Sequence, residues 1–116
     1  MNKLLIYIGE NEEFDVAATI GAISSMPGVS NARSGTFIGA IFECEYAANG
    51  RSTIVRMSPE LETITAEGFG DESLAFALEL QRRLSIPLRA TDMDYTFDVA
   101  LRDFGCVSDL REATSN

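Results

Sequence analysis

The stretch FIGAIFECEYAANGRSTIVRM, residues 37–57, decides the fold because it combines two strand patterns with a turn signal. Over residues 37–46 the side chains alternate with a period of two, which is the spacing of a β-strand. The pair Asn49-Gly50 is typical of a tight hairpin turn, and the β-branched run 52–57 follows it. This stretch therefore predicts an antiparallel hairpin.

Two elements are predicted on the N-terminal side of this hairpin. Residues 4–8 are a continuous apolar run, which is typical of a central strand buried on both faces. Asn11 is the predicted N-cap of a helix that continues to about Met26, where Pro27-Gly28 stops it. The apolar positions of this helix include Val16, Ile20 and Ile23. Their spacing gives the helix one apolar face for packing on a sheet.

Further elements are predicted on the C-terminal side. Residues 61–67 alternate again and form either a separate strand or a continuation of the preceding strand past a bulge. Residues 72–84 have the spacing of an amphipathic helix, and residues 95–102 alternate like a half-buried strand. The polar tail 103–116 is expected to fray at its end.

The order of these elements predicts the fold class. A strand, a helix, two or three strands, a second helix and a last strand are arranged most economically as an α+β ferredoxin-like two-layer sandwich. We expect an antiparallel sheet of four or five strands with two helices on one face. The 116 residues suit one compact domain, predicted over residues 1–102, followed by the C-terminal tail 103–116.

Composition and charge restrict the function. Eighteen acidic and nine basic residues give a net charge of −9, which argues against binding a nucleic acid backbone or an anionic membrane. A basic protein partner is the natural complement. The chain has no histidine, so it lacks the usual general acid or base near neutral pH and the commonest transition-metal ligand. We therefore expect no enzymatic activity, no cofactor and no metal.

The N-terminal segment and the cysteines indicate a compartment. The apolar run 4–8 is far shorter than the core of a signal peptide, and no stretch has the roughly 18 apolar residues of a membrane-spanning helix. We expect a soluble, cytoplasmic protein. Cys44 and Cys106 are predicted to be free thiols, since a domain of this size does not need a disulfide.

A candidate partner-binding surface follows from the strand 37–46. Phe37, Ile41, Glu43 and Glu45 share one side of it, although the opposite side is already apolar. Because the helices of a two-layer fold cover only one face, this side is expected to expose apolar groups rimmed by acids. Two alternatives are that the C-terminal tail, or a second copy of the chain in a homodimer, covers the patch.

A second acidic group is assigned to the same partner. It consists of Asp92, Asp94 and Asp98. These carboxylates could offer oxygen ligands to Ca²⁺ or Mg²⁺, but they lack the regular spacing of a Ca²⁺-binding loop. We therefore assign them to partner binding and predict no metal site.

The second half of the chain carries a family resemblance. Residues 62–98 read ETITAEGFGDESLAFALELQRRLSIPLRATDMDYTFD. In the pattern of this segment, and in size, acidity and predicted architecture, the chain resembles bacterial immunity proteins encoded beside polymorphic or contact-dependent-inhibition toxins. The resemblance implies one cognate toxin, often a basic nuclease. It also implies an inhibitor that blocks the toxin's active site or an adjacent surface.

A different class of function stays open as an alternative. The segment Met26-Pro27-Gly28-Val29 resembles the Pro-Gly-Val turn of ferredoxin-like amino-acid-sensing domains. That resemblance implies a regulatory module that binds a small molecule as a homodimer.

Overall fold

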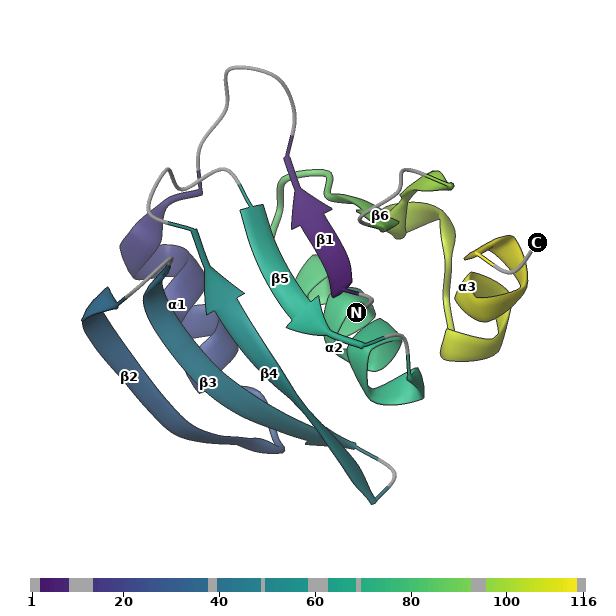
Figure 1. Cartoon of the computed structure of the whole chain (residues 1–116). Helices are drawn as coiled ribbons and strands as arrows, with labels where there is room; N and C mark the ends of the chain where they lie inside the picture. Colours follow the sequence, from purple (N-terminus) through teal and green to yellow (C-terminus); the bar gives the residue numbers. More distant parts are fainter. Residues whose placement is uncertain are drawn as a thin grey trace.

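The computed structural model describes residues 3–8, 14–37, 40–48, 50–58, 63–68, 70–92 and 96–114. The described elements form one sheet and a layer of helices (Figure 1). In chain order they are β1 (Lys3–Tyr7), α1 (Val16–Ser24), β2 (Val29–Phe37), β3 (Ala40–Ala48), β4 (Arg51–Met57), β5 (Thr63–Glu67), α2 (Asp71–Arg83), β6 (Arg89–Asp92), β7 (Asp98–Ala100), the 3-10 helix η1 (Leu101–Asp103) and α3 (Val107–Thr114).

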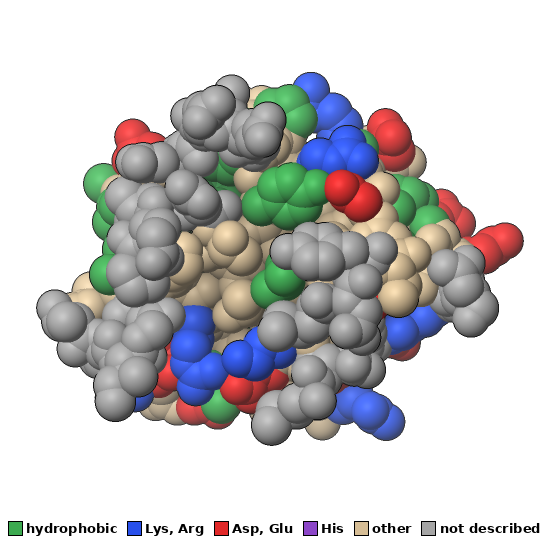
Figure 2. Space-filling view, turned by 45° about the horizontal axis from the view of Figure 1, so that its top comes forward, with side chains coloured by type: hydrophobic (Ala, Val, Ile, Leu, Met, Phe, Trp, Pro, Cys, Tyr) green, Lys and Arg blue, Asp and Glu red, His purple; other side chains and the backbone are tan. Residues whose placement is uncertain are grey.

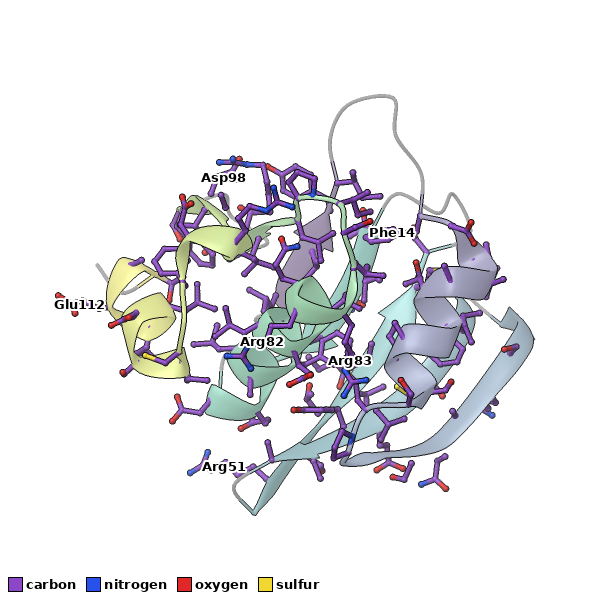
Figure 3. All side chains as sticks on the ribbon, turned by 180° about the vertical axis from the view of Figure 1, so that it is seen from behind. Phe14, Arg51, Arg82, Arg83, Asp98 and Glu112 are labelled. Atoms are coloured by element: carbon purple, nitrogen blue, oxygen red, sulfur yellow. The ribbon has the colours of Figure 1, made fainter. Side chains whose placement is uncertain are left out.

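The sheet has the strand order β2-β3-β4-β5-β1-β6-β7, and every neighbouring pair is antiparallel. Both α1 and α2 lie on one side of it, as the views from the front and from behind agree (Figures 1 and 3). The α+β class and the antiparallel sheet are confirmed. The predicted number of four or five strands is wrong, because the described residues already form seven.

The additional strands come from segments with weak strand patterns. β2 has the polar, glycine-containing sequence VSNARSGTF, and its pairing with β3 contains two register shifts. The segment 37–46, predicted as one strand, therefore spans the end of β2 and most of β3. β6 has four residues, and the last predicted strand is reduced to the three residues of β7. These strands form because a neighbour supplies the hydrogen-bonding edge, which local alternation does not reveal.

Two other local predictions are confirmed. β1 lies in the interior of the sheet, between β5 and β6, and β5 is a separate strand. The expected burial of β1 on both faces is wrong, because Leu4 and Ile6 are fully buried while Leu5 and Tyr7 are half-buried.

The first helix is shorter than predicted, because α1 begins at Val16 and ends at Ser24. Its N-cap is Asp15 in place of the predicted Asn11, and the Asp15 carboxylate accepts a hydrogen bond of 3.0 Å from the backbone N–H of Ala18. The predicted cap Asn11 lies outside the described residues.

The hydrophobic core fills the space between the sheet and the helices. Its fully buried members include Leu4, Ile6, Ile23, Phe42, Val55, Met57, Ile64, Leu74, Phe76, Leu80, Leu88 and Leu101. The rings of Tyr46 on β3 and Phe76 on α2 meet edge to face, with 5.4 Å between their centroids. Through this contact, α2 packs the helix layer against the middle of the sheet.

The C-terminal segment differs from the frayed tail that its polarity predicts. Residues 101–103 form η1 and residues 107–114 form α3. Leu110 is completely buried, while Phe104 and Val107 pack against the core. Both η1 and α3 contact α2, so this segment lies with the helix layer and leaves the opposite face of the sheet uncovered by it (Figures 1 and 3).

Gly28 gives a first test of the fold. Its φ is +92°, and a Cβ atom added there would lie 2.3 Å from the backbone oxygen of Ala47. We expect Gly28→Ala to destabilise the protein by about 1–3 kcal/mol. The matched control is Gly21→Ala, in the exposed part of α1 with nothing within 4 Å of the added atom. It should stabilise the helix by about 0.5–1 kcal/mol. Urea unfolding measures both, and equal effects would contradict this account.

The thiols give a second test. Cys44 is buried and Cys106 is exposed, and neither forms a disulfide, as predicted. Burial, with smaller contributions from the charges of Glu43 and Glu45, raises the pKa of Cys44 to about 11. Because the thiolate is the reactive form, an aromatic disulfide reagent at pH 8 should label one cysteine in the native protein and two after unfolding. The Cys106→Ser variant should show no rapid labelling before it unfolds.

Candidate protein-binding face

The side of the sheet opposite the helices is the candidate site. The register places one side chain from each strand in a row across it, because directly paired residues point to the same face. From β2 to β7 the row is Arg33, Glu43, Arg56, Thr65, Leu5, Thr91 and Asp98. Within the described residues, no helix covers this row, and the row is exposed or half-buried except at Thr91. Thr91 is only 2% exposed, and its hydroxyl donates to the backbone oxygen of Phe97. We call this surface the open face.

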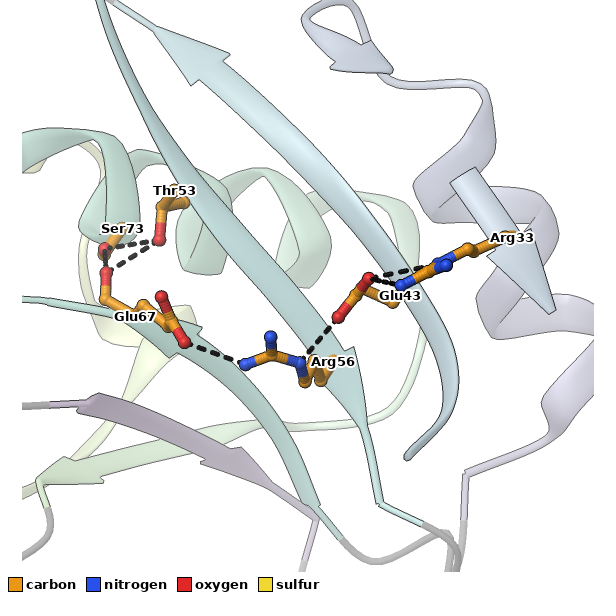
Figure 4. A network of polar contacts seen from close by, with 6 residues as sticks. All are labelled: Arg33, Glu43, Thr53, Arg56, Glu67 and Ser73. Carbon is orange, nitrogen blue, oxygen red and sulfur yellow. Dashed lines mark hydrogen bonds and ion pairs between the residues drawn. The ribbon is translucent and has the colours of Figure 1, made fainter. Parts of the chain in front are cut away.

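Ion pairs connect four strands on the open face (Figure 4). The Glu43 carboxylate lies between two guanidinium groups, with Arg33 Nη2 at 2.5 Å and Arg56 Nε at 2.7 Å. Arg56 also reaches Glu67 Oε1, at 2.8 Å from its Nη1. Hydrogen bonds from Arg33 and Arg56 lower the pKa of Glu43 below its ordinary value of 4.5. Charges on β2, β3, β4 and β5 are therefore held in a fixed pattern.

A shallow groove of about 270 Å³ lies beside this network. It is lined by Asn31, Arg33, Glu43, Cys44, Glu45 and Ile54. The side-chain amide of Asn31 donates to Glu45 Oε2 at 2.5 Å, and Asn31 itself has a positive φ of 52°. The irregular edge strand β2 thus folds its polar side chains toward β3 and leaves Ile54 in the groove wall.

Part of the predicted site lies together here. Ile41, Glu43 and Glu45 lie on one side of β3 and are half-buried. Phe37 is the last residue of β2 and pairs with Ala40 of β3, while its side chain is outside the described atoms. The sequence predicts that these acids form a rim of charges around the apolar patch. In the structure both carboxylates have partners within the chain, since Glu43 is bound by two arginines and Glu45 by Asn31.

The second acidic group is not brought to the same place. Asp98 lies on β7, near the opposite edge of the sheet, where it accepts hydrogen bonds from Tyr7 and Arg89. Asp92 is only 8% exposed, and its carboxylate accepts from the backbone N–H of Thr96 at 2.7 Å. Asp92 therefore joins the end of β6 to Thr96 and offers little surface to a partner. Asp94 lies outside the described residues.

Sequence reasoning missed several residues of the open face. Ile54 and Arg56 share one side of β4, and the alternation within residues 52–57 could have found them. Asn31 and Arg33 carry no comparable signal, because β2 lacks an alternating pattern. On the space-filling surface, basic and acidic side chains lie next to each other, with separate hydrophobic patches between them (Figure 2).

The described residues contain no group of three or more His, Cys, Asp or Glu residues that could hold a metal ion. None of the helices in the described part of the chain is both long enough and apolar enough to cross a membrane. Comparison with protein-family models, curated proteins and solved structures gives no match. The functional conclusion therefore depends on the geometry of the site.

The ion-pair network predicts a pH-dependent contribution to stability. Because the pKa of Glu43 is lowered in the folded state, its contribution is present above the ordinary value of 4.5 and is lost as the pH falls through the folded value. Glu43→Gln should therefore lower the urea midpoint at pH 7, and the difference from wild type should shrink steadily below pH 4.5. A difference that persists unchanged at pH 2–3 would assign the effect to packing. Glu112→Gln, on an exposed part of α3, is the control and should leave the urea midpoint unchanged both at pH 7 and below pH 4.5.

Proposed function

We propose that this chain is a small acidic binding protein that holds a basic partner protein on the open face. The observation that carries the proposal is the open face itself, on which half-buried apolar residues lie among charges held by ion pairs. The apolar members include Leu5, Ile41 and Ile54. Such a mixture of anchors and oriented polar groups is typical of non-obligate protein interfaces.

Charge supports a basic partner. The chain has a net charge of −9, yet six of its nine basic residues are engaged in ion pairs within the described structure. Their positive charge is thereby neutralised locally, and the excess acids determine the field at longer range. A field of this sign accelerates association with a basic protein and depends on salt.

The fixed side chains also favour tight binding. Arg33 and Arg56 are already oriented by Glu43 before any partner arrives. A surface that is ordered in advance loses less side-chain entropy on association than a mobile one. The open face therefore supports recognition of one defined partner.

The finer form of the proposal is an immunity protein that inhibits a cognate bacterial toxin in the cytoplasm. It is supported by acidity, small size and a connectivity related to the ferredoxin-like pattern. Two crossovers, β1-α1-β2 and β5-α2-β6, each join strands that run in the same direction, and β1 lies between β5 and β6. In this proposal β3 and β4 are an insertion into a ferredoxin-like plan, and β7 extends its edge.

The alternative, a small-molecule sensor that acts as a homodimer, has less support. The resemblance at Pro27-Gly28-Val29 has a packing explanation, since Gly28 provides the positive φ and the close approach to Ala47. A homodimer formed through the open face is an outcome of the experiment below.

The test begins with co-expression of the chain and the product of the adjacent reading frame, followed by measurement of their association rate at low and high salt. We expect a complex whose association slows as salt rises. Ile54→Arg places a repelling charge on the open face and should weaken the complex at least about tenfold. Ala17→Arg adds the same charge to the exposed side of α1, in the helix layer, and should leave the complex much less affected.

Two outcomes would contradict the proposal. Equal weakening by both substitutions would show that only net charge matters and that the open face is not the interface. A chain that remains a homodimer and binds no basic protein, with its dimer broken by Ile54→Arg, would favour the sensor.

A further inference from the structure

We propose that a cavity at the N-terminus of α2 binds a guanidinium or alkylammonium group, with the Glu72 carboxylate as its anchor. The cavity has a volume of about 290 Å³ and is lined by Arg51, Gly70, Asp71, Glu72 and Arg111. It lies where the β3–β4 hairpin, the start of α2 and α3 come together, and none of its lining residues belongs to the groove on the open face.

Glu72 is the residue that points to a ligand. The residue is only 8% exposed, and its Oε2 atom is buried without a hydrogen-bond partner among the described residues. A buried carboxylate oxygen without a donor is costly, and nearly all buried polar groups have a partner. Because Oε2 is closed to water-sized molecules in this conformation, a donor in the cavity would pair with it after the carboxylate turns toward the cavity, and such a donor is the missing component.

The arginines of the cavity do not supply that donor. Arg111 Nη2 donates to Asp71 Oδ1 at 2.8 Å, and neither Arg111 nor Arg51 donates a hydrogen bond to Glu72 Oε2. Arg51 is the first residue of β4 and is exposed to solvent (Figure 3). The group that lacks a hydrogen-bond donor is thus the Glu72 carboxylate, on the acidic side of the cavity.

A cationic hydrogen-bond donor suits the Glu72 carboxylate better than a neutral one. Glu72 lies in the first turn of α2, where the helix dipole favours a negative charge. Charge-assisted hydrogen bonds to a carboxylate are about twice as strong as neutral ones, and a guanidinium group can present two parallel N–H donors. The net charge of −9 also favours a cation over an anion.

Gly70 is the second part of the site. A Cβ atom added to Gly70 would lie 2.1 Å from Glu72 Oε1, so the carboxylate folds over the glycine in space that a side chain would occupy. The φ of Gly70 is −73°, which alanine also adopts readily. Gly70→Ala should therefore displace the carboxylate without changing its charge or straining the backbone.

The cation can come from a free small molecule or from a Lys or Arg side chain of the basic partner proposed above. Binding of a free cation does not depend on that partner. Only the second source rests on the proposed function, and separate arms of the experiment distinguish the two.

The first arm titrates the isolated protein with methylguanidinium and, separately, with inorganic phosphate, and follows the backbone amide signals of residues 70–73 by NMR. Wild type should show saturable shifts with methylguanidinium and none with phosphate. Glu72→Gln and Gly70→Ala should weaken this binding at least about tenfold. Glu112→Gln removes an exposed acid that points away from α3 and should bind like wild type (Figure 3). Arg51→Gln removes a like charge and should strengthen cation binding severalfold.

The inference is overturned if wild type shows no saturable shifts, or if Glu72→Gln binds methylguanidinium as wild type does. It is also overturned if phosphate binds instead and Arg51→Gln abolishes that binding, which would make the cavity an anion site. Two independent variants act on one carboxylate, so a folding defect in either leaves the other to decide.

The second arm measures the complex with the basic partner. Weaker binding by Glu72→Gln, with an unchanged effect of Ile54→Arg, identifies a partner side chain as the cation. An unchanged complex identifies a free cation as the natural ligand. If no basic partner exists, the proposed function fails while the titration of the isolated protein still decides on the cavity.

Discussion

The burial of α2 against the sheet is the interaction on which the rest of the structure depends. This helix contacts β1, β3, β4 and β5 as well as α1, η1 and α3. Its side chains Leu74, Phe76 and Leu80 are completely buried. Because burial of apolar area is the main favourable term in folding, α2 joins elements that are far apart in sequence into one core. The α3 segment can be ordered because α2 offers it an apolar surface.

Polar groups at both ends of α2 make that burial possible. At its start, the backbone oxygen of Glu67 accepts hydrogen bonds from Thr53 at 2.7 Å and from Ser73 at 2.8 Å (Figure 4). At its end, the Gln81 side chain donates to the oxygen of Ile86 and accepts from the N–H of Leu88. Buried backbone groups at both turns are thereby satisfied. Glu72, at the same end as Ser73, is the exception among the described residues, since its buried oxygen has no donor.

The one-sided placement of the helices also determines which face of the sheet is left open. The helix layer leaves one face of a seven-stranded sheet to be stabilised by its own side chains, and ion pairs such as Arg56 with Glu43 and Glu67 perform this task. Exposed ion pairs contribute little to stability individually, but a network orients its members. The ion pairs therefore hold Arg33, Glu43, Arg56 and Glu67 in defined positions on the open face.

The amino-acid sequence by itself determined the α+β class, the interior position of β1, the separate strand β5, the second helix and the free thiols. Each rests on a local signal, such as the apolar run 4–8 or the alternation within residues 61–67. Only the tertiary structure decided the number of strands, because β2 and β6 are strands by virtue of the edges they join. It also separated Asp92 and Asp98 from Glu43 and revealed the cavity at Glu72. Such features depend on which distant segments pack together, and periodicity along the chain carries no information on that.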